Sequence, residues 1–109
     1  MARSRTDAPS PQVRLSDGTL ARVVPSAFGG GWELDVDGTP QSHVDLADPT
    51  YLEFEYIRRM AAAIDLIAPA GAPLRVLHLG GGALTLPRYV AATRPGSPQR
   101  VVEIDGPLV

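Results

Sequence analysis

The chain has 109 residues, of which 44% are hydrophobic, and this length suffices for one small folded domain. Its formal net charge of −2 offers no basic surface for nucleic acid or an anionic membrane, and no apolar run reaches the roughly 18–20 residues of a membrane span. The absence of cysteine and lysine excludes disulfides, thiol catalysis and Schiff-base chemistry. Because the sequence shows neither a membrane span nor a secretory signal, we expect a soluble, cytoplasmic protein.

Turn sequences divide the N-terminal part of the chain into short strands. Residues 1–12 are rich in Pro and Ser and are predicted to form a disordered tail. Residues 13–47 alternate short apolar stretches with Asp-Gly pairs at 17–18 and 37–38, a pattern typical of β-hairpins. We therefore predict a small antiparallel β-hairpin element over 13–47, with Trp32 as its main hydrophobic anchor.

A helix is predicted next, over residues 49–68. Asp48 is a good N-cap, and Pro49 suits the first helical turn. Apolar side chains then recur at three- and four-residue spacing, which places them on one helical face: Leu52, Tyr56, Met60, Ile64 and Ile67. The pattern indicates an amphipathic helix that packs through this face.

A strand, a glycine turn, a helix and a second strand follow. The apolar run 74–79 leads directly into three glycines, residues 84–93 fit a short helix, and residues 100–104 fit another strand. This is the order of a βαβ unit, in which two parallel strands are joined through a helix. The predicted fold class is therefore α/β: a small N-terminal antiparallel β-element followed, over 48–109, by the start of a Rossmann-like nucleoside-binding domain.

That second part would hold an incomplete sheet. Two parallel strands leave open edges, and parallel sheets normally need cover on both faces. We therefore expect the chain to be the front part of a larger protein and to be inactive alone.

The glycine turn and an acidic residue after the next strand form the strongest candidate site. Gly80, Gly81 and Gly82 allow a ligand to approach the backbone closely, and the helix behind them offers free N–H groups. A carboxylate about 20 residues after such a turn typically binds ribose hydroxyls, and Glu103 stands at about that distance. The pattern predicts an adenosine site, although Thr85 in place of a further glycine argues against NAD. The alternative is a tight turn and a solvated glutamate.

Four short motifs stand in a fixed order along the chain. They are Val36-Asp-Gly-Thr-Pro-Gln41, the helix within residues 48–60, Val76-Leu-His-Leu-Gly-Gly-Gly82 and Val102-Glu-Ile-Asp105. In order and spacing the series resembles the spermidine synthase (polyamine aminopropyltransferase) family, over about residues 34–109. The resemblance implies a Rossmann-like transferase whose donor is S-adenosylmethionine or its decarboxylated form. It also implies transfer of an aminopropyl group from a sulfonium to a polyamine, and assembly as a homo-oligomer.

The resemblance also implies roles for individual residues. Residues 80–82 match the turn beside the methionine-derived tail of the nucleoside, and Glu103 matches the carboxylate that binds its ribose. Gln41 matches a glutamine that contacts the ligand from the β-element, and Tyr56 matches a tyrosine that faces the amine substrate. From the residues alone, two alternatives stay open: Gln41 as a polar strand end, and Tyr56 as part of the core.

Departures from the family pattern leave the activity open. Ala83 stands where the family has the aspartate that holds the ammonium of the donor, and Ile57 replaces a polar residue of the helix. The family's catalytic aspartate would lie beyond Val109, so no catalytic residue is assigned.

Three interpretations follow. The first is a spermidine synthase-like protein that binds an S-adenosylmethionine-type nucleoside without being a strict aminopropyltransferase. The second is an S-adenosylmethionine-dependent methyltransferase-like protein, because the loss of the aspartate at Ala83 suits a donor that carries a carboxylate. Against it, His78 stands where common methyltransferases have an acidic residue. The third is a truncated non-catalytic module.

No metal site is predicted. His43 and His78 lie far apart in the sequence, and His78 is interpreted as a packed strand residue. A run of carboxylates is interpreted as a solvated hairpin face rather than a set of ligands for a hard cation: Asp35, Asp37, Asp45 and Asp48.

Overall fold

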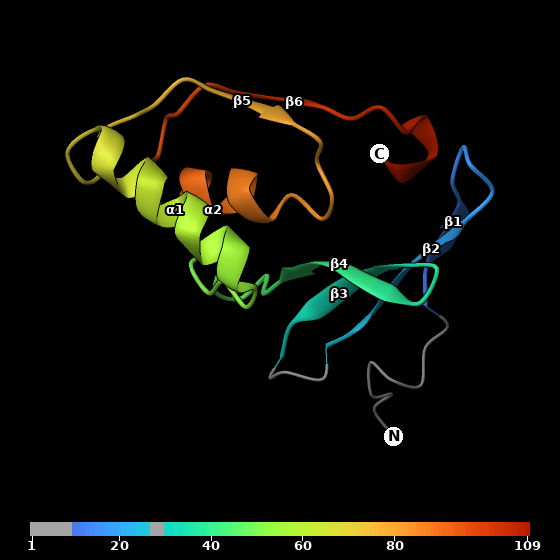
Figure 1. The fold of residues 1–109 in the computed structure, drawn as a ribbon. Coiled ribbons are helices and arrows are strands. Elements are labelled where there is room, and N and C mark those ends of the chain that lie inside the picture. Colours follow the sequence, from blue (N-terminus) through green and yellow to red (C-terminus); the bar gives the residue numbers. More distant parts are fainter. Residues whose placement is uncertain (1–9, 27–29) are drawn as a thin grey trace.

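The computed structural model describes residues 10–26 and 30–109, and it combines a four-stranded antiparallel sheet with two helices and a parallel strand pair (Figure 1). Of the predicted tail, residues 1–9 lie outside the described residues. Gln12 is not part of a tail, because it begins the first strand and pairs with Arg22. None of the described helices is both long and apolar enough to cross a membrane.

The antiparallel sheet is a meander in which each strand pairs with the next. Its strands are β1 (Gln12–Arg14), β2 (Leu20–Pro25), β3 (Trp32–Val36) and β4 (Thr39–Val44). Between β3 and β4, Asp37 and Gly38 have positive φ angles of 53° and 82°, which is the twist that a tight two-residue hairpin loop requires. The predicted hairpins therefore form, and they join into one sheet.

Helix α1 (Glu55–Ile67) begins later than predicted. The Oδ1 atom of Asp48 accepts hydrogen bonds from the backbone N–H of Thr50 at 3.1 Å and from its hydroxyl, and Tyr51 N–H donates to the Asp48 carbonyl at 3.0 Å. These bonds close a local turn, and such a turn competes with helix formation for the same donors. The helix therefore starts after Phe54, and Asp48 does not cap it.

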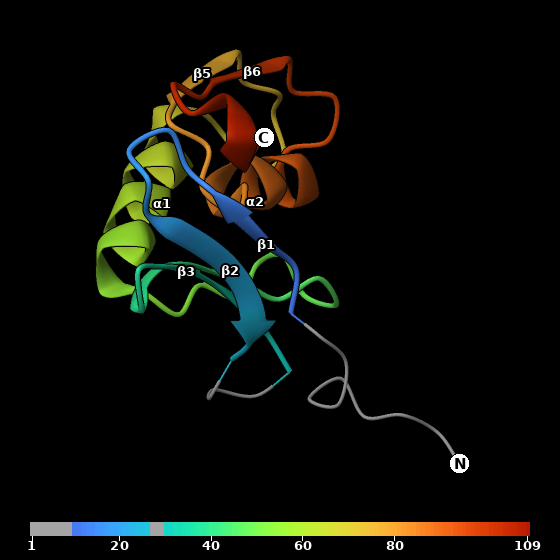
Figure 2. The same cartoon turned by 90° about the vertical axis from the view of Figure 1, so that its right-hand side faces the viewer.

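The glycine turn, α2 (Thr85–Thr93) and two parallel strands form in the predicted order. Strand β5 (Val76–Leu79) pairs with β6 (Gln99–Val102), and a 3-10 turn, η1 (Gly106–Leu108), follows. Both views show the two helices on one side of the β5–β6 pair, with the larger sheet following on that same side (Figures 1 and 2). Leu84 lies outside α2, because it adopts a left-handed conformation with φ of 62°.

The core lies where the two helices meet. Leu52, Ala61 and Leu86 are buried together, with Ile57 and Ile64 packed against them. In the antiparallel sheet the buried apolar residues are Ala21, Leu34 and Val44. Trp32, the predicted anchor, is half-buried. Three apolar residues of the β5–β6 pair are exposed: Leu77, Leu79 and Val102.

A buried arginine ties α1 to α2. Arg94 follows α2 and is only 2% exposed. Its Nη1 donates to the carbonyls of Pro69 and Ala72, each at 2.8 Å, and its Nη2 donates to the Ala68 carbonyl at 2.9 Å. These carbonyls belong to the end of α1 and the segment after it, where backbone acceptors lack helical partners. The guanidinium therefore caps the C-terminus of α1, where its positive charge also interacts favourably with the negative end of the helix dipole.

Candidate functional site

The glycine turn after β5 lies against the antiparallel sheet. Gly80 and Gly82 have positive φ angles of 89° and 52°, and Gly80 N–H donates to the Val102 carbonyl at 2.7 Å. At Gly82 a Cβ atom would collide with Oγ of Ser42, which lies on β4. The turn thus needs glycine at Gly82 for two reasons, backbone conformation and close contact with the sheet.

Alanine at position 82 is expected to destabilise the fold by about 1–3 kcal/mol, because it combines a left-handed backbone with a collision. The variant Gly80→Ala is its control, since a Cβ there meets nothing within 4 Å and only the φ penalty remains. In Gly82→Ala/Ser42→Ala the nearest remaining side-chain atom is the Cβ at 3.6 Å, so most of the collision cost should disappear. Denaturant unfolding measures the three changes. Equal losses with and without Ser42→Ala would contradict the collision.

Glu103 reaches back to this turn from the end of β6. Its Oε1 accepts the N–H of Gly81 at 3.0 Å, and its Oε2 accepts the N–H of Asp105 at 2.9 Å. These backbone donors, Gly81 first and Asp105 second, lower the pKa of the carboxyl below its ordinary value of 4.5. Each carboxylate oxygen can accept more than one hydrogen bond. Glu103 is therefore an ionised acceptor that has capacity for further donors.

A hollow of about 610 Å³ surrounds this carboxylate. The backbone of Gly81 and Gly82 forms one wall, and the remaining described lining is apolar: Leu84, Val101, Val102, Leu108 and Val109. The arrangement sets one charged acceptor among apolar surfaces. It suits a ligand that has a flat apolar body and neighbouring hydroxyl groups.

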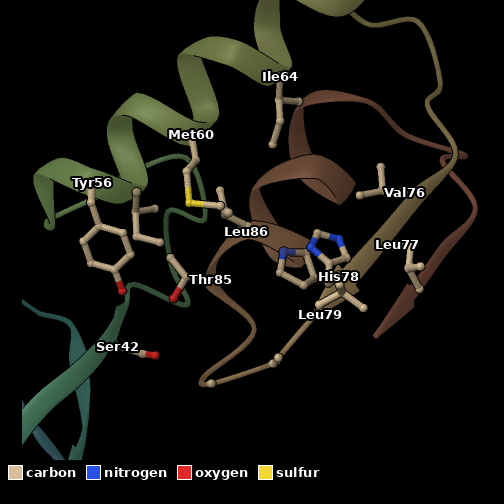
Figure 3. Close-up of a pocket in the computed structure, with 15 residues that line it drawn as sticks. Ser42, Tyr56, Met60, Ile64, Val76, Leu77, His78, Leu79, Thr85 and Leu86 are labelled. Atoms are coloured by element: carbon tan, nitrogen blue, oxygen red, sulfur yellow. The ribbon is translucent and has the colours of Figure 1, made fainter. Parts of the chain in front are cut away.

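A second pocket, of about 560 Å³, lies on the other side of the turn, between α1, α2 and β5 (Figure 3). Gly81 and Gly82 line both hollows. Apolar side chains of the helices line the body of this second pocket, and the hydroxyls of Ser42, Tyr56 and Thr85 gather at the end near β4 (Figure 3). The turn is therefore the shared wall between an acidic hollow and an apolar pocket.

Tyr56 is not a core residue. It is 55% exposed, it lines the second pocket, and its hydroxyl lies 3.4 Å from the backbone carbonyl of Gln41. The interpretation of Tyr56 as core packing is therefore wrong. Glu103 contacts the turn from one hollow, and Tyr56 shares the other hollow with the glycines. The side chain of Gln41 is exposed and lines neither hollow.

Other candidate ligands are engaged locally. His78 is half-buried, and its Nε2 lies 2.7 Å from Oε1 of Gln99. Asp45 accepts backbone N–H groups from Ala47 and Asp48, in a turn of its own. Across residues 10–26 and 30–109, no three His, Asp or Glu side chains come close enough together to hold a metal ion.

Two contacts that the sequence did not predict join the antiparallel sheet and its hairpins to α2 and to the segment after β6. The hydroxyl of Thr85 donates to the His43 carbonyl at 2.9 Å. Asp105 accepts the N–H and the hydroxyl of Ser16 at 3.1 and 3.0 Å. In the sequence, Thr85 was noted only because it replaces a glycine, and Asp105 only because it ends a motif. Neither observation predicted that these side chains would contact the sheet region.

Comparison with known proteins identifies one similar solved structure. No protein-family model matches the chain, and no curated protein matches it. Among solved structures, a probable spermidine synthase from Corynebacterium glutamicum ATCC 13032 is similar, with 35% sequence identity and a TM-score of 0.75. The similarity covers 93% of this chain and 37% of that one, so the chain spans little more than a third of that protein's length.

Proposed function

We propose that the chain is spermidine synthase-like and binds a nucleoside of the S-adenosylmethionine type at the Rossmann-like turn between β5 and α2. The observation that carries the proposal is the Glu103 carboxylate, fixed on the N–H of Gly81 at 3.0 Å inside an apolar hollow. Ribose hydroxyls would complete its acceptor capacity, and adenine would lie against the apolar wall. The similarity to a probable spermidine synthase supports the same assignment.

The nature of the donor follows from Ala83. The Nε of Arg88 donates to the Ala83 carbonyl at 3.3 Å, so a guanidinium lies beside the position at which an aspartate would hold an ammonium. A positive group there favours a donor that carries a carboxylate. This observation supports the second candidate function, a methyltransferase-like protein that uses S-adenosylmethionine itself.

Calorimetric titration tests both candidates. Adenosine and 5′-methylthioadenosine are expected to bind, and 2′,3′-dideoxyadenosine, which lacks the ribose hydroxyls, is expected to bind far more weakly. Tighter binding of S-adenosylmethionine than of its decarboxylated form would favour the methyltransferase-like candidate, and the reverse order would favour aminopropyl transfer. Equal affinity for adenosine and its dideoxy analogue would refute the nucleoside site.

Nucleoside affinity should be constant from pH 7 to pH 5. The backbone donors hold the pKa of Glu103 below 4.5, so the carboxylate stays ionised over this range and keeps its acceptor oxygens. As the pH falls through the lowered pKa, protonation removes both the affinity and the stability that the ionised form contributes. Titrations at several pH values, with circular dichroism as the check on folding, measure the profile. A decline already between pH 7 and pH 6 would contradict it.

A further inference from the structure

The segment that carries Glu103 has already left the β5–β6 pair. Strand β6 ends at Val102, and Ile104, the residue after Glu103, is 99% exposed. Packing of Ile104 therefore does not fix the segment, and hydrogen bonds do so instead. Oε1 of Glu103 accepts the Gly81 N–H, and Oε2 accepts the N–H of Asp105. The geometry of the carboxylate thus depends on where the backbone of Asp105 is held.

Asp105 is held by the turn between β1 and β2. Its Oδ2 accepts the backbone N–H of Ser16 at 3.1 Å, and its Oδ1 accepts the Ser16 hydroxyl at 3.0 Å. An aspartate immediately before a helical turn commonly caps the N–H groups of that turn, whereas both oxygens of Asp105 bind Ser16. Both views place the β1–β2 turn beside η1 (Figures 1 and 2). The carboxylate of Asp105 therefore joins two elements that are far apart in the sequence.

The β1–β2 turn presents the two donors of Ser16 in a fixed arrangement. Its backbone closes through the Leu15 N–H, which donates to the Thr19 carbonyl at 2.8 Å. The side chain of Asp17 accepts the N–H of Thr19 at 2.9 Å and its hydroxyl at 2.6 Å. These bonds hold the turn together without using the N–H or the hydroxyl of Ser16, so both donors are directed at Asp105.

The same contact holds one wall of the hollow around Glu103. Leu108 and Val109 line that hollow, and the Leu108 N–H donates to the Asp105 carbonyl at 3.1 Å. A displacement of Asp105 would therefore move two things at once. One is the N–H that donates to Glu103, and the other is the apolar surface that faces this carboxylate.

We propose that Ser16 is a positioning residue for the Glu103 carboxylate, because its two donors hold Asp105 and the Asp105 N–H holds Oε2 of Glu103. The antiparallel sheet thereby takes part in the candidate nucleoside site through its first hairpin. This role rests on the proposed function in one respect, since ribose hydroxyls are taken as the further donors to Glu103. In the free chain it concerns only the carboxylate and its backbone partners.

The first test needs no ligand. Ser16→Ala removes a hydroxyl at an exposed position and changes no charge, so the variant should fold. Backbone donors, Gly81 first and Asp105 second, lower the pKa of Glu103, so a less firmly held Asp105 should let this pKa rise toward its ordinary value. The carbon-13 resonance of the Glu103 carboxyl, followed against pH in the full chain, measures the midpoint. An unchanged midpoint in Ser16→Ala would overturn the proposal.

The second test compares adenosine with 2′,3′-dideoxyadenosine by calorimetric titration. Ser16→Ala should lose at least about threefold of the preference for adenosine, because only adenosine donates ribose hydroxyls to Glu103. The ratio of the two affinities cancels any loss at the apolar wall, which both nucleosides would contact. A full preference in Ser16→Ala would contradict the assigned role. If the parent chain binds neither nucleoside, the nucleoside site is refuted, while the midpoint still decides the role of Ser16.

Two control variants separate positioning from a general effect on the hairpin. Ser16→Thr keeps the hydroxyl and should match the parent chain in both tests. Arg14→Ala removes another contact of the same turn, in which Nη1 of Arg14 donates to the Gly18 carbonyl at 2.9 Å. It should change neither the midpoint nor the preference. If Arg14→Ala reproduced the effects of Ser16→Ala, loosening of the hairpin would explain both, and the role assigned to Ser16 would be wrong.

Discussion

Replacing Glu103 with alanine is expected to lower the affinity for adenosine at least about 100-fold. Two ribose hydroxyls that donate to a carboxylate contribute roughly 1.5–3 kcal/mol each, and each 1.4 kcal/mol corresponds to tenfold in affinity. Glu103 also anchors Gly81 at 3.0 Å, so the variant loses both the acceptor and the fixed turn. Isothermal titration of the two proteins with adenosine measures the change.

The dideoxy analogue provides the matched control for this result. The parent chain should prefer adenosine strongly over 2′,3′-dideoxyadenosine, and Glu103→Ala should bind the two about equally. This double comparison isolates the contact between the carboxylate and the hydroxyls from any loosening of the turn. A variant that keeps the full preference for adenosine would show that another group reads the ribose.

The variant Arg94→Ala is expected to lose at least about 3 kcal/mol of unfolding free energy. The guanidinium donates to the carbonyls of Pro69, Ala68 and Ala72, and each buried acceptor left without a donor costs about 1–3 kcal/mol. A domain of this size is stable by only about 5–15 kcal/mol in total. Thermal and urea unfolding should therefore show a large drop in stability, with α1 fraying from its C-terminal end.

Two further substitutions test whether the lost hydrogen bonds of Arg94 cause the drop in stability. Arg94→Lys keeps the charge but cannot reproduce the planar fork of donors, so an intermediate loss is expected. Arg100→Ala removes an exposed arginine from β6 and should change the stability by less than about 0.5 kcal/mol. If Arg94→Ala matched Arg100→Ala, the capping role assigned to Arg94 would be wrong.

Local pattern predicted the elements around the candidate site. The apolar run before Gly80 forms β5, the glycines form the turn, and α2 and β6 follow in the expected order. The spacing grouped Glu103 with the turn as one candidate site, and its Oε1 lies 3.0 Å from Gly81 N. These features follow from residue types near one another in the chain, which is why the sequence sufficed for them. Whether they bind a nucleoside stays a prediction.

Contacts between distant residues account for what the sequence did not predict. No role was predicted for Arg94, which follows the helix expected over 84–93, because its carbonyl partners stand far earlier in the chain. The predicted start of the helix was too early because the side chain of Asp48 closes a turn with Thr50. The same carboxylate could have capped a helix, and the local sequence does not distinguish the two arrangements. The position of Gln41 in a predicted strand did not determine which way its side chain points. In the structure its backbone carbonyl, and not its side-chain amide, lies near the Tyr56 hydroxyl.

The bond between Ser16 and Asp105 has a consequence for biosynthesis. It joins residues 89 positions apart, and Asp105 is the neighbour of the strand end that carries Glu103. A ribosome delivers the β1–β2 turn long before it delivers that acceptor, and long loops close at an entropic cost that grows with their length. The β1–β2 hairpin is therefore synthesised early, and the N–H and hydroxyl of Ser16 stay hydrated at first. They can donate to Asp105 only after that residue has left the ribosome. Nascent chains stalled before residue 103 would carry the glycine turn without the Glu103 carboxylate that accepts the Gly81 N–H, and without the Asp105 carboxylate that binds Ser16.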